Sequence, residues 1–227
     1  MRDRTYGPYH REIPSPLQAL WEALGDAGPV AGQVTASGLR AAGRITVFLA
    51  LTGVLLPVAL VAYPFGSGAV RRVALLWFRG VARLATLRVT VNGAPVNEAG
   101  TLYICNHVSY LDIPVLAMLI DAAFVAKDDV ADWPLFGLCS KIYRTMFIKR
   151  DPREALKQRA EMAARLAQGD SLMLFPEGTS SDGQRVLPFK SALFAVAEGS
   201  EGAAPPKVQP VSIAYARYAD GQPLGNG

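Results

Sequence analysis

Hydrophobic residues fill one long stretch near the start of the chain, where residues 45–63 contain no charged side chain. As a helix at about 1.5 Å per residue, this stretch reaches roughly 28 Å, close to the thickness of the hydrocarbon layer of a membrane. Gly53 and Pro57 interrupt it, and a broken helix can also enter and leave a single leaflet. The pattern predicts a membrane anchor, either spanning or re-entrant. A buried helix of a soluble core is the alternative.

A second pattern follows at residues 71–88, where five arginines and no acidic residue accompany apolar residues near helical spacing, namely Val73, Leu76, Trp77, Val81 and Leu84. This is typical of an amphipathic helix at a membrane interface, although a solvated arginine-rich helix has the same pattern. With Arg40 and Arg44 before the anchor, the arginines favour a cytoplasmic location for everything downstream. We expect an N-terminal segment at residues 1–39, followed by the anchor and the interfacial helix at residues 40–98.

Beyond the Asn92-Gly93 turn signal, short apolar strands alternate with helical patterns, as in a mostly parallel sheet with covering helices. The expected strands are residues 102–105, 123–126, 146–148, 172–175 and 208–214, with helices at residues 113–120 and 191–197. The clearest helix begins at Pro152, ends at Gly169 and has on one face Leu156, Met162, Ala163 and Leu166. We expect an α/β catalytic domain over residues 99–227. Because the chain stops soon after the last strand, a longer protein in which this domain continues fits the pattern.

Composition adds information on partners and on metals. The net charge of +4 and the isoelectric point near 9.2 favour an anionic partner. Beside an apolar anchor, an anionic membrane surface fits better than nucleic acid, for which the sequence has no motif. Cys105 and Cys139 lie in apolar surroundings without the Cys-x-x-Cys spacing of a zinc or redox site, so we expect two core residues and no metal.

Candidate catalytic residues follow the strand expected at residues 102–105, where His107 and Asp112 stand five positions apart. In one continuous helix two such side chains point about 140° apart, so they meet only if the chain passes from strand through loop to helix. An imidazole can then take the proton of an alcohol while the carboxylate fixes its tautomer. By spacing alone, Asp112 fits equally well as a helix cap or, with Ser109, a capping box. The other histidine of the chain is His10, so a histidine base would be His107.

Two further strand ends carry candidate binding residues. After one apolar strand come Glu177, Gly178 and Thr179, where the carboxylate can project above the sheet edge and the glycine lets a ligand approach the backbone. Another strand ends in Lys149 and Arg150. Ligands bind at the carboxyl edge of open α/β sheets, and a guanidinium can hold a phosphate or carboxylate through two hydrogen bonds. An ordinary strand-to-loop turn and a pair of solvated cations are the alternatives.

Taken together, these motifs resemble those of the glycerolipid acyltransferases, typified by bacterial 1-acylglycerol-3-phosphate (lysophosphatidic acid) acyltransferase. The resemblance covers about residues 100–215 and rests on four motifs in the same order: His107-x-x-x-x-Asp112, Phe147-Ile148-Lys149-Arg150, Phe175-Pro176-Glu177-Gly178-Thr179 and Gln209-Pro210-Val211. It implies the α/β fold of that family, with His107 as base and Asp112 as its partner. It also implies that the substrates contact Lys149, Arg150, Glu177, Gly178, Thr179 and, on the acyl-binding side, Pro210.

One departure from the family pattern bears on the acceptor lipid. Family members that act on phosphate-bearing acceptors usually have an arginine after Glu-Gly-Thr, and here that residue is Ser180. The run from Ser180 to Ser191 resembles the bacterial branch that acylates lyso-ornithine lipid, whose headgroup has a carboxylate and an amine instead of a phosphate. The resemblance thus favours lyso-ornithine lipid, giving ornithine lipid. Lysophosphatidic acid is the alternative, because Arg185 or Lys190 can supply the missing charge.

The expected reaction is a direct transfer without an acyl-enzyme. His107 removes the proton of the acceptor hydroxyl, and the oxygen attacks the thioester of acyl-carrier protein or coenzyme A, with no metal or other cofactor. A serine hydrolase built on Ser109 is a distant alternative, because the sequence has no Gly-x-Ser-x-Gly elbow. A non-catalytic lipid-binding protein is another. We expect an enzyme of lipid biosynthesis at the inner (cytoplasmic) membrane, with the catalytic domain facing the cytoplasm.

Overall fold

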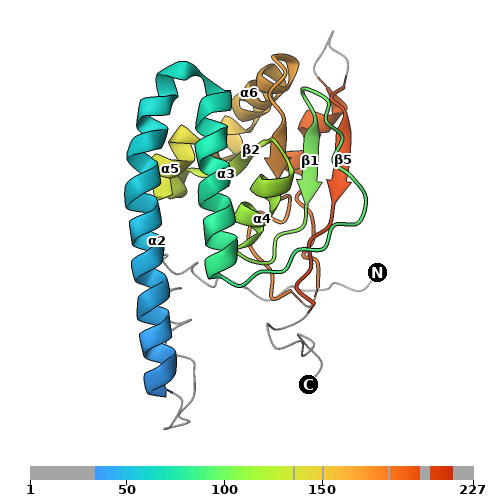
Figure 1. Ribbon diagram of the computed structural model, residues 1–227. Helices are drawn as coiled ribbons and strands as arrows, with labels where there is room; N and C mark the ends of the chain where they lie inside the picture. The colour runs from blue at the N-terminus through green and yellow to red at the C-terminus, as the bar shows by residue number, and fades with distance from the viewer. Residues whose placement is uncertain (1–33, 135, 150, 184, 200–204, 217–227) are drawn as a thin grey trace. The chain divides into compact units, whose positions relative to one another are not determined.

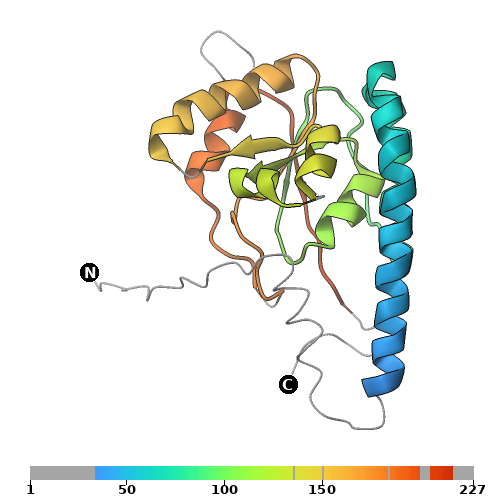
Figure 2. The same cartoon turned by 90° about the vertical axis from the view of Figure 1, so that its left-hand side faces the viewer.

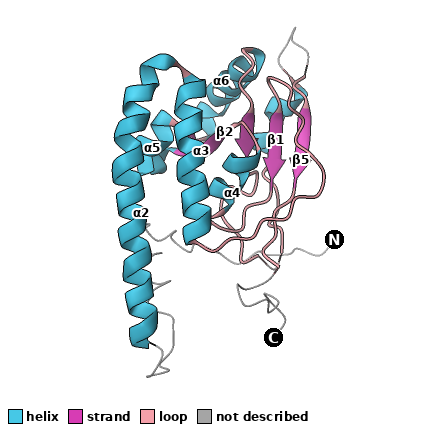
Figure 3. Ribbon diagram, in the orientation of Figure 1, coloured by secondary structure: helices cyan, strands magenta, loops and turns pink. Residues whose placement is uncertain are grey.

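The structure, a computed structural model, describes residues 34–216 except residues 135, 150, 184 and 200–204. The chain divides into two compact units, Met1–Val47 and Phe48–Gly227, and the second contains a sheet in the order β3-β2-β4-β1-β5. All neighbouring strands pair in parallel (magenta in Figure 3). The strands are β1 (Leu102–Cys105), β2 (Ala123–Lys127), β3 (Met146–Ile148), β4 (Leu172–Leu174) and β5 (Val208–Val211). The predicted parallel sheet is confirmed.

Both faces of the sheet are covered by helices, so side chains alternate between two apolar clusters along each strand. Tyr103 and Cys105 of β1 face α3 (Ser67–Leu84) and α4 (Asp112–Leu119). Leu102 and Ile104 face the other side, where α6 (Ala155–Ala167) and the 3-10 turn η4 (Ala195–Glu198), which follows α7 (Ser191–Phe194), cover the sheet. Figures 1 and 2 show α6 on the side of the strands away from α4. With both faces closed, polar chemistry is confined to the strand ends.

The apolar segment forms one continuous helix, α2 (Val34–Ala62), which passes through Gly53 and contains Pro57. The stretch Gly38–Phe65 is long and apolar enough to cross a membrane, and only 11% of its apolar 18-residue part is buried within the protein. A core helix of a soluble protein would be mostly buried, so that alternative does not fit. Val54 and Val61 have exposed fractions of 65% and 71%.

From Phe48 onward, α2 leads through the 3-10 turn η1 (Tyr63–Phe65) into α3 and packs beside it (Figure 1). Trp77 donates its indole N–H to Thr52 Oγ1 at 2.9 Å, and its ring contacts Phe48. On another face of α3, Phe78 is buried against the sheet, while Leu76 is 56% exposed. The sequence pattern had assigned Leu76 and not Phe78 to the apolar face. The helix is therefore a packed layer of this unit, not an arginine-rich helix surrounded by water.

Three local predictions differ from the structure. Leu156 of α6 is 80% exposed, because at 3.6 residues per turn it points about 120° away from the buried Met162 and about 80° away from the buried Leu166. A 3-10 turn, η3 (Pro152–Glu154), precedes the helix. The pattern missed two short elements between β2 and β3, the 3-10 turn η2 (Asp128–Asp132) and α5 (Phe136–Ile142). β5 ends at Val211, earlier than expected. Beyond it, the carbonyl of Ile213 accepts a hydrogen bond from the side chain of Asn106.

Candidate active site

The His-x-x-x-x-Asp motif and the Glu-Gly turn follow adjacent strands. β1 pairs with β4, with Ile104 opposite Leu174, and the two strands lead to His107 and Glu177. The carboxyl ends of parallel strands meet at one edge of a sheet, which is where open α/β sheets bind ligands. The structure therefore places two of the four motifs side by side at this edge.

His107 and Asp112 meet in the way that the spacing requires. β1 ends at Cys105, a loop follows, and α4 begins at Asp112. His107 Nδ1 lies 2.7 Å from Asp112 Oδ2. Because a carboxylate only accepts hydrogen bonds, Nδ1 carries the proton and Nε2 is left as the basic nitrogen. The side chain of His107 retains an exposed fraction of 14%.

Asp112 is fully buried and completely hydrogen-bonded. Its Oδ2 also accepts the backbone N–H groups of Val108 and Ser109 at 2.7 and 3.0 Å, and its Oδ1 accepts the hydroxyl of Tyr215 at 2.8 Å. Burial alone would raise the pKa of Asp112, but the bonds from His107, the two backbone groups and Tyr215 lower it below its usual value. The capping alternative does not apply, because α4 has no side-chain cap and the carboxylate turns back toward the loop.

The imidazole ring is also held by stacking. The rings of His107 and Phe175 have centroids 4.3 Å apart and planes inclined by 23°. Phe175 in turn stacks on Phe124 of β2 at 6.1 Å. Together with the Nδ1 bond, this stack leaves the imidazole little freedom to rotate.

The Glu-Gly turn holds the backbone of the base from both sides. Glu177 Oε1 accepts the N–H of His107 at 3.1 Å, and Ser181 donates its N–H to the His107 carbonyl at 2.8 Å. Gly178 has a φ of +69°, a conformation that residues with a side chain rarely adopt, so glycine is favoured there. A Cβ at this position would lie 2.8 Å from the ammonium nitrogen of Lys190, the movable end of a flexible side chain. The turn is thus part of the histidine site and not an ordinary connection.

A second oxygen of this turn has no partner within the described residues. Glu177 is 2% exposed, yet its Oε2 accepts no hydrogen bond there. A buried carboxylate oxygen without a donor is costly, which indicates a place for a ligand donor. The ammonium of Lys190 lies against Gly178, the residue that follows Glu177, so the turn has a carboxylate and a cation close to it.

Of the other two motifs, the one that follows β3 lies farther from the base, whereas the one on β5 lies on a strand that pairs with β1. β3 is separated from β1 by two strands, roughly 14 Å at the usual strand spacing, so Lys149 is exposed on the same edge but not beside His107. Arg150 lies outside the described residues. Pro210 is exposed in β5, opposite Ile104; β5 is an edge strand, where a missing N–H is tolerated. Thr179 is half-buried after Gly178.

Sequence reasoning missed two residues that complete the histidine site, Asn106 and Tyr215. The amide of Asn106 bonds both the N–H and the carbonyl of Ile213, each at 2.9 Å. Alternation along the extended chain offered a weak signal, since Val211, Ile213 and Tyr215 share one side. Nothing local indicated that this side faces Asp112.

Cys105 and Ser109 are the potential nucleophiles near His107, and neither is arranged for attack. Burial raises the pKa of Cys105 to about 12, with Asp112 and Glu177 adding to the effect, so the thiol stays protonated. Ser109 Oγ accepts the N–H of Leu111 at 3.2 Å and thereby belongs to the turn. Cys139, which we expected in the core, is only half-buried.

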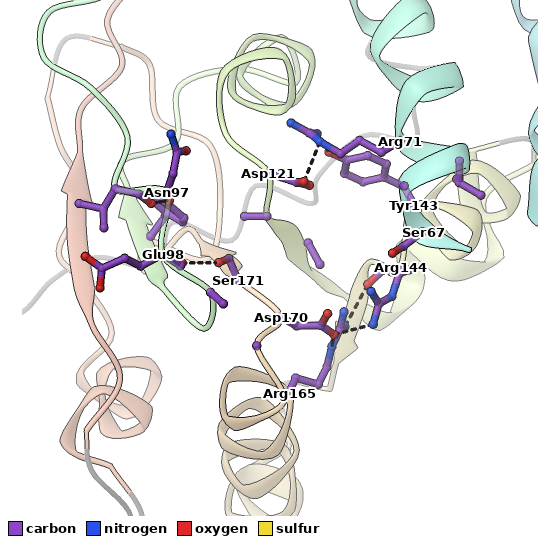
Figure 4. A pocket seen from close by; sticks show the side chains of 18 of the residues that line it. Ser67, Arg71, Asn97, Glu98, Asp121, Tyr143, Arg144, Arg165, Asp170 and Ser171 are labelled. Carbon is purple, nitrogen blue, oxygen red and sulfur yellow. Dashed lines mark hydrogen bonds and ion pairs between the residues drawn. The ribbon is translucent and has the colours of Figure 1, made fainter. Parts of the chain in front are cut away.

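A cavity of about 420 Å³ lies at the opposite, amino edge of the sheet (Figure 4). Its arginines are paired: Arg71 with Asp121 at 2.8 Å, and Arg144 and Arg165 with Asp170 at 2.6 and 3.1 Å. These bonds close the loops at the amino ends of the strands. The cavity is thus far from the chemistry of His107.

This chain is similar to known acyltransferases. Residues 88–214 match the family described as Acyltransferase. The lyso-ornithine lipid O-acyltransferase of Brucella abortus is 40% identical over 77% of this chain and 69% of its own length. That of Rhizobium meliloti is 39% identical over 66% of this chain and 52% of its own length. A 1-acyl-sn-glycerol-3-phosphate acyltransferase of Neisseria gonorrhoeae is 35% identical over 44% of this chain and 40% of its own length.

A solved structure has a similar fold. The crystal structure of the 1-acyl-sn-glycerophosphate acyltransferase from Thermotoga maritima aligns with a TM-score of 0.50 and 21% identity, over 74% of this chain and 83% of that one. At this identity the likeness speaks for the α/β fold, with its parallel sheet and covering helices.

Proposed function

Because this chain belongs to the acyltransferase family, we propose that it transfers an acyl chain from an acyl thioester to the free hydroxyl of a lysolipid, with lyso-ornithine lipid as preferred acceptor. The proposal rests above all on the 2.7 Å bond between His107 Nδ1 and Asp112 Oδ2 at the ligand-binding edge of the sheet. That bond leaves Nε2 available as a base, which is what attack by a hydroxyl requires.

In the proposed mechanism, His107 Nε2 takes the proton of the acceptor hydroxyl as its oxygen attacks the thioester carbonyl carbon. The carbon–sulfur bond then breaks, and the imidazolium returns the proton to the departing thiolate. Asp112 stabilises the imidazolium and keeps the reactive tautomer. The transfer is direct and uses no metal or cofactor; the donor is acyl-carrier protein or acyl-coenzyme A.

The preference for lyso-ornithine lipid is supported by the relatives and by local chemistry. Ser180 stands where an arginine is typical of phosphate-bearing acceptors. An ornithine headgroup carries an amine and a carboxylate, which complement Glu177 Oε2 and the Lys190 ammonium at the adjoining Gly178. The alternative acceptor is 1-acylglycerol-3-phosphate, because an ammonium also binds phosphate and the Neisseria relative carries that name.

The proposed location is the inner membrane, with the catalytic unit facing the cytoplasm. α2 supplies a helix long and apolar enough to span a membrane. Arginines flank it, with Arg40 and Arg44 before the apolar stretch and Arg71 and Arg72 after it, and no acidic residue occurs between residues 45 and 88. The arginines that follow the apolar stretch support a cytoplasmic location for the catalytic unit and its contact with anionic lipids.

A direct test offers lyso-ornithine lipid and lysophosphatidic acid in parallel to membranes that contain the protein, with one acyl thioester. We expect faster acylation of lyso-ornithine lipid, measured as labelled diacyl product. Exclusive use of lysophosphatidic acid would overturn the acceptor preference while leaving the acyl transfer intact.

The role of the base is tested by His107→Ala, with His10→Ala as the matched control. General-base help is worth about 10²- to 10⁴-fold, so we expect His107→Ala to lose at least that factor in turnover and His10→Ala to keep wild-type turnover. Membrane content and thermal unfolding report whether each variant is folded. A folded His107→Ala variant that keeps more than a few per cent of wild-type turnover contradicts the mechanism.

A further inference from the structure

Tyr215 lies in the histidine site although no motif includes it. Its hydroxyl donates to Asp112 Oδ1 at 2.8 Å, on the oxygen that does not contact His107. Asp112 Oδ2 takes the other three bonds, from His107 and the N–H groups of Val108 and Ser109. The carboxylate is fully buried, so within the described residues Tyr215 supplies the donor that Oδ1 needs.

The approach of Tyr215 to Asp112 is built into the fold. β5 pairs with β1 up to the Cys105–Val211 position, and the regular ladder then stops. The side chain of Asn106 replaces the next rung by bonding the N–H and carbonyl of Ile213, both at 2.9 Å. Two residues later the chain again faces the same side, which brings Tyr215 to the loop between β1 and α4.

We propose that Tyr215 is a positioning residue, which fixes the Asp112 carboxylate and through it the imidazole of His107. This inference rests on the proposed role of His107 as base. Without the hydroxyl, Oδ1 would be buried and unpaired, and the carboxylate would be free to turn away from Nδ1. Asn106 serves the same arrangement by holding the segment that carries Tyr215.

The hydroxyl of Tyr215 also affects the charge distribution around Asp112. The groups that face Asp112 are His107, Tyr215 and two backbone N–H groups, and the Glu177 carboxylate and the Cys105 thiol lie nearby. Burial, followed by the carboxylate of Asp112, raises the pKa of Tyr215, so its hydroxyl remains a donor at all working pH values. Removing this donor leaves Oδ1 without a partner and changes the charge that Asp112 presents to His107, so the pH dependence of the rate should change.

The test compares Tyr215→Phe with Tyr103→Phe. Tyr103 is a matched control, because its hydroxyl also donates one hydrogen bond, to the carbonyl of Val96, but Tyr103 packs under α3 and α4 and lines the cavity at the amino edge. For Tyr215→Phe we expect kcat to fall by about 10- to 100-fold, the range for loss of one hydrogen bond to a charged group. We also expect an unchanged KM for the lysolipid and a rate profile displaced along the pH axis. Tyr103→Phe should lower the melting temperature and leave the pH profile in place.

Three outcomes separate the possibilities. If Tyr215→Phe keeps the wild-type kcat and pH profile while His107→Ala is inactive, the positioning role is wrong and the proposed function stands. If Tyr215→Phe loses stability as Tyr103→Phe does, and its rate falls with no change in the pH profile, its role is only structural and the inference fails. If folded His107→Ala is active, the proposed mechanism itself fails.

Discussion

At the scale of single residues, the two oxygens of Glu177 have different surroundings. Oε1 holds the backbone N–H of His107, whereas Oε2 has no partner within the described chain. One side chain therefore combines a structural contact to the base with a free acceptor for a ligand. A substitution of Glu177 that keeps the bond to His107 but removes the charge can separate the structural role from ligand binding.

We expect Glu177→Ala to cost about 2–4 kcal/mol in the free energy of unfolding, because it leaves the His107 N–H unpaired and opens a cavity. Glu177→Gln retains an oxygen for that N–H and should stay close to wild type in stability, yet lose transfer activity if charge on Oε2 binds the acceptor. Thermal unfolding in detergent and transfer rates measure the two effects. Equal destabilisation by both variants would contradict the contact to His107.

Asp112 makes a prediction about acid stability. Its pKa in the folded protein lies below the ordinary 3.8. A carboxylate of this kind stabilises the fold fully above its unfolded pKa, and the contribution is lost as the pH falls through the folded pKa. The stability difference between wild type and Asp112→Asn should therefore be largest near neutral pH and shrink below about pH 4.

The control for this experiment is Asp129→Asn. Asp129 forms an ion pair with Lys127, and its side chain is 47% exposed. A surface pair of this kind contributes at most about 1 kcal/mol, so this variant should follow the wild-type dependence on pH. A stability difference for Asp112→Asn that stays constant from pH 7 to pH 3 would show that the carboxylate is not held as described.

At the scale of elements, two helical glycines with different surroundings form a matched pair. Gly137 of α5 lies against the backbone carbonyl of Ala131 in η2, and a Cβ at Gly137 would collide with that oxygen. Gly53 of α2 has nothing within 4 Å of the position of a Cβ. The contact of α5 with η2 is thus sensitive to one methyl group.

We expect Gly137→Ala to lower the free energy of unfolding by about 1–3 kcal/mol, because a backbone carbonyl cannot move aside as a side chain can. Gly53→Ala should be neutral or stabilising by up to about 1 kcal/mol, since alanine favours the helix. Melting temperatures of the two variants in the same detergent test this difference. A harmless Gly137→Ala would mean that α5 packs differently.

At the scale of the whole molecule, the exposed apolar side chains of α2 predict membrane attachment. Val54, Val58 and Val61 lie at helical spacing and have exposed fractions of 65%, 47% and 71%. Each charged residue near the middle of a membrane helix costs about 2.5–3.5 kcal/mol. Changing all three to aspartate should release the protein from membranes without removing any packed core contact.

Leu156→Asp is the control for attachment, because Leu156 is 80% exposed but belongs to α6. The fraction that stays with membranes after a high-salt wash is the measurement. The triple variant should move to the soluble fraction and Leu156→Asp should not. Retention of the triple variant would mean that α2 is not the anchor.

Local patterns in the sequence were enough to identify the strands, most of the helices and the His107 and Asp112 pair. Apolar strands and helix signals depend on neighbouring residues, so the parallel sheet followed from their alternation. The four motifs also led to the family, because their order along the chain is a property of the sequence. The short elements η2 and α5 were not identified, because a 3-10 turn or a helix of two turns gives little periodicity. Leu156 was assigned to the wrong face of α6, because its spacing from Met162 and Leu166 does not fit one helical face.

Tertiary structure alone decided which of these residues lie together. Strand order brings β4 beside β1 and puts β3 at the far edge, so Glu177 meets the base while Lys149 does not. Long-range packing makes α3 a layer over the sheet and brings Tyr215 to Asp112 across 103 positions of sequence. The physical reason is that such contacts depend on the order of the strands and on the path of the loops. The spacing of side chains along the chain carries no information on either.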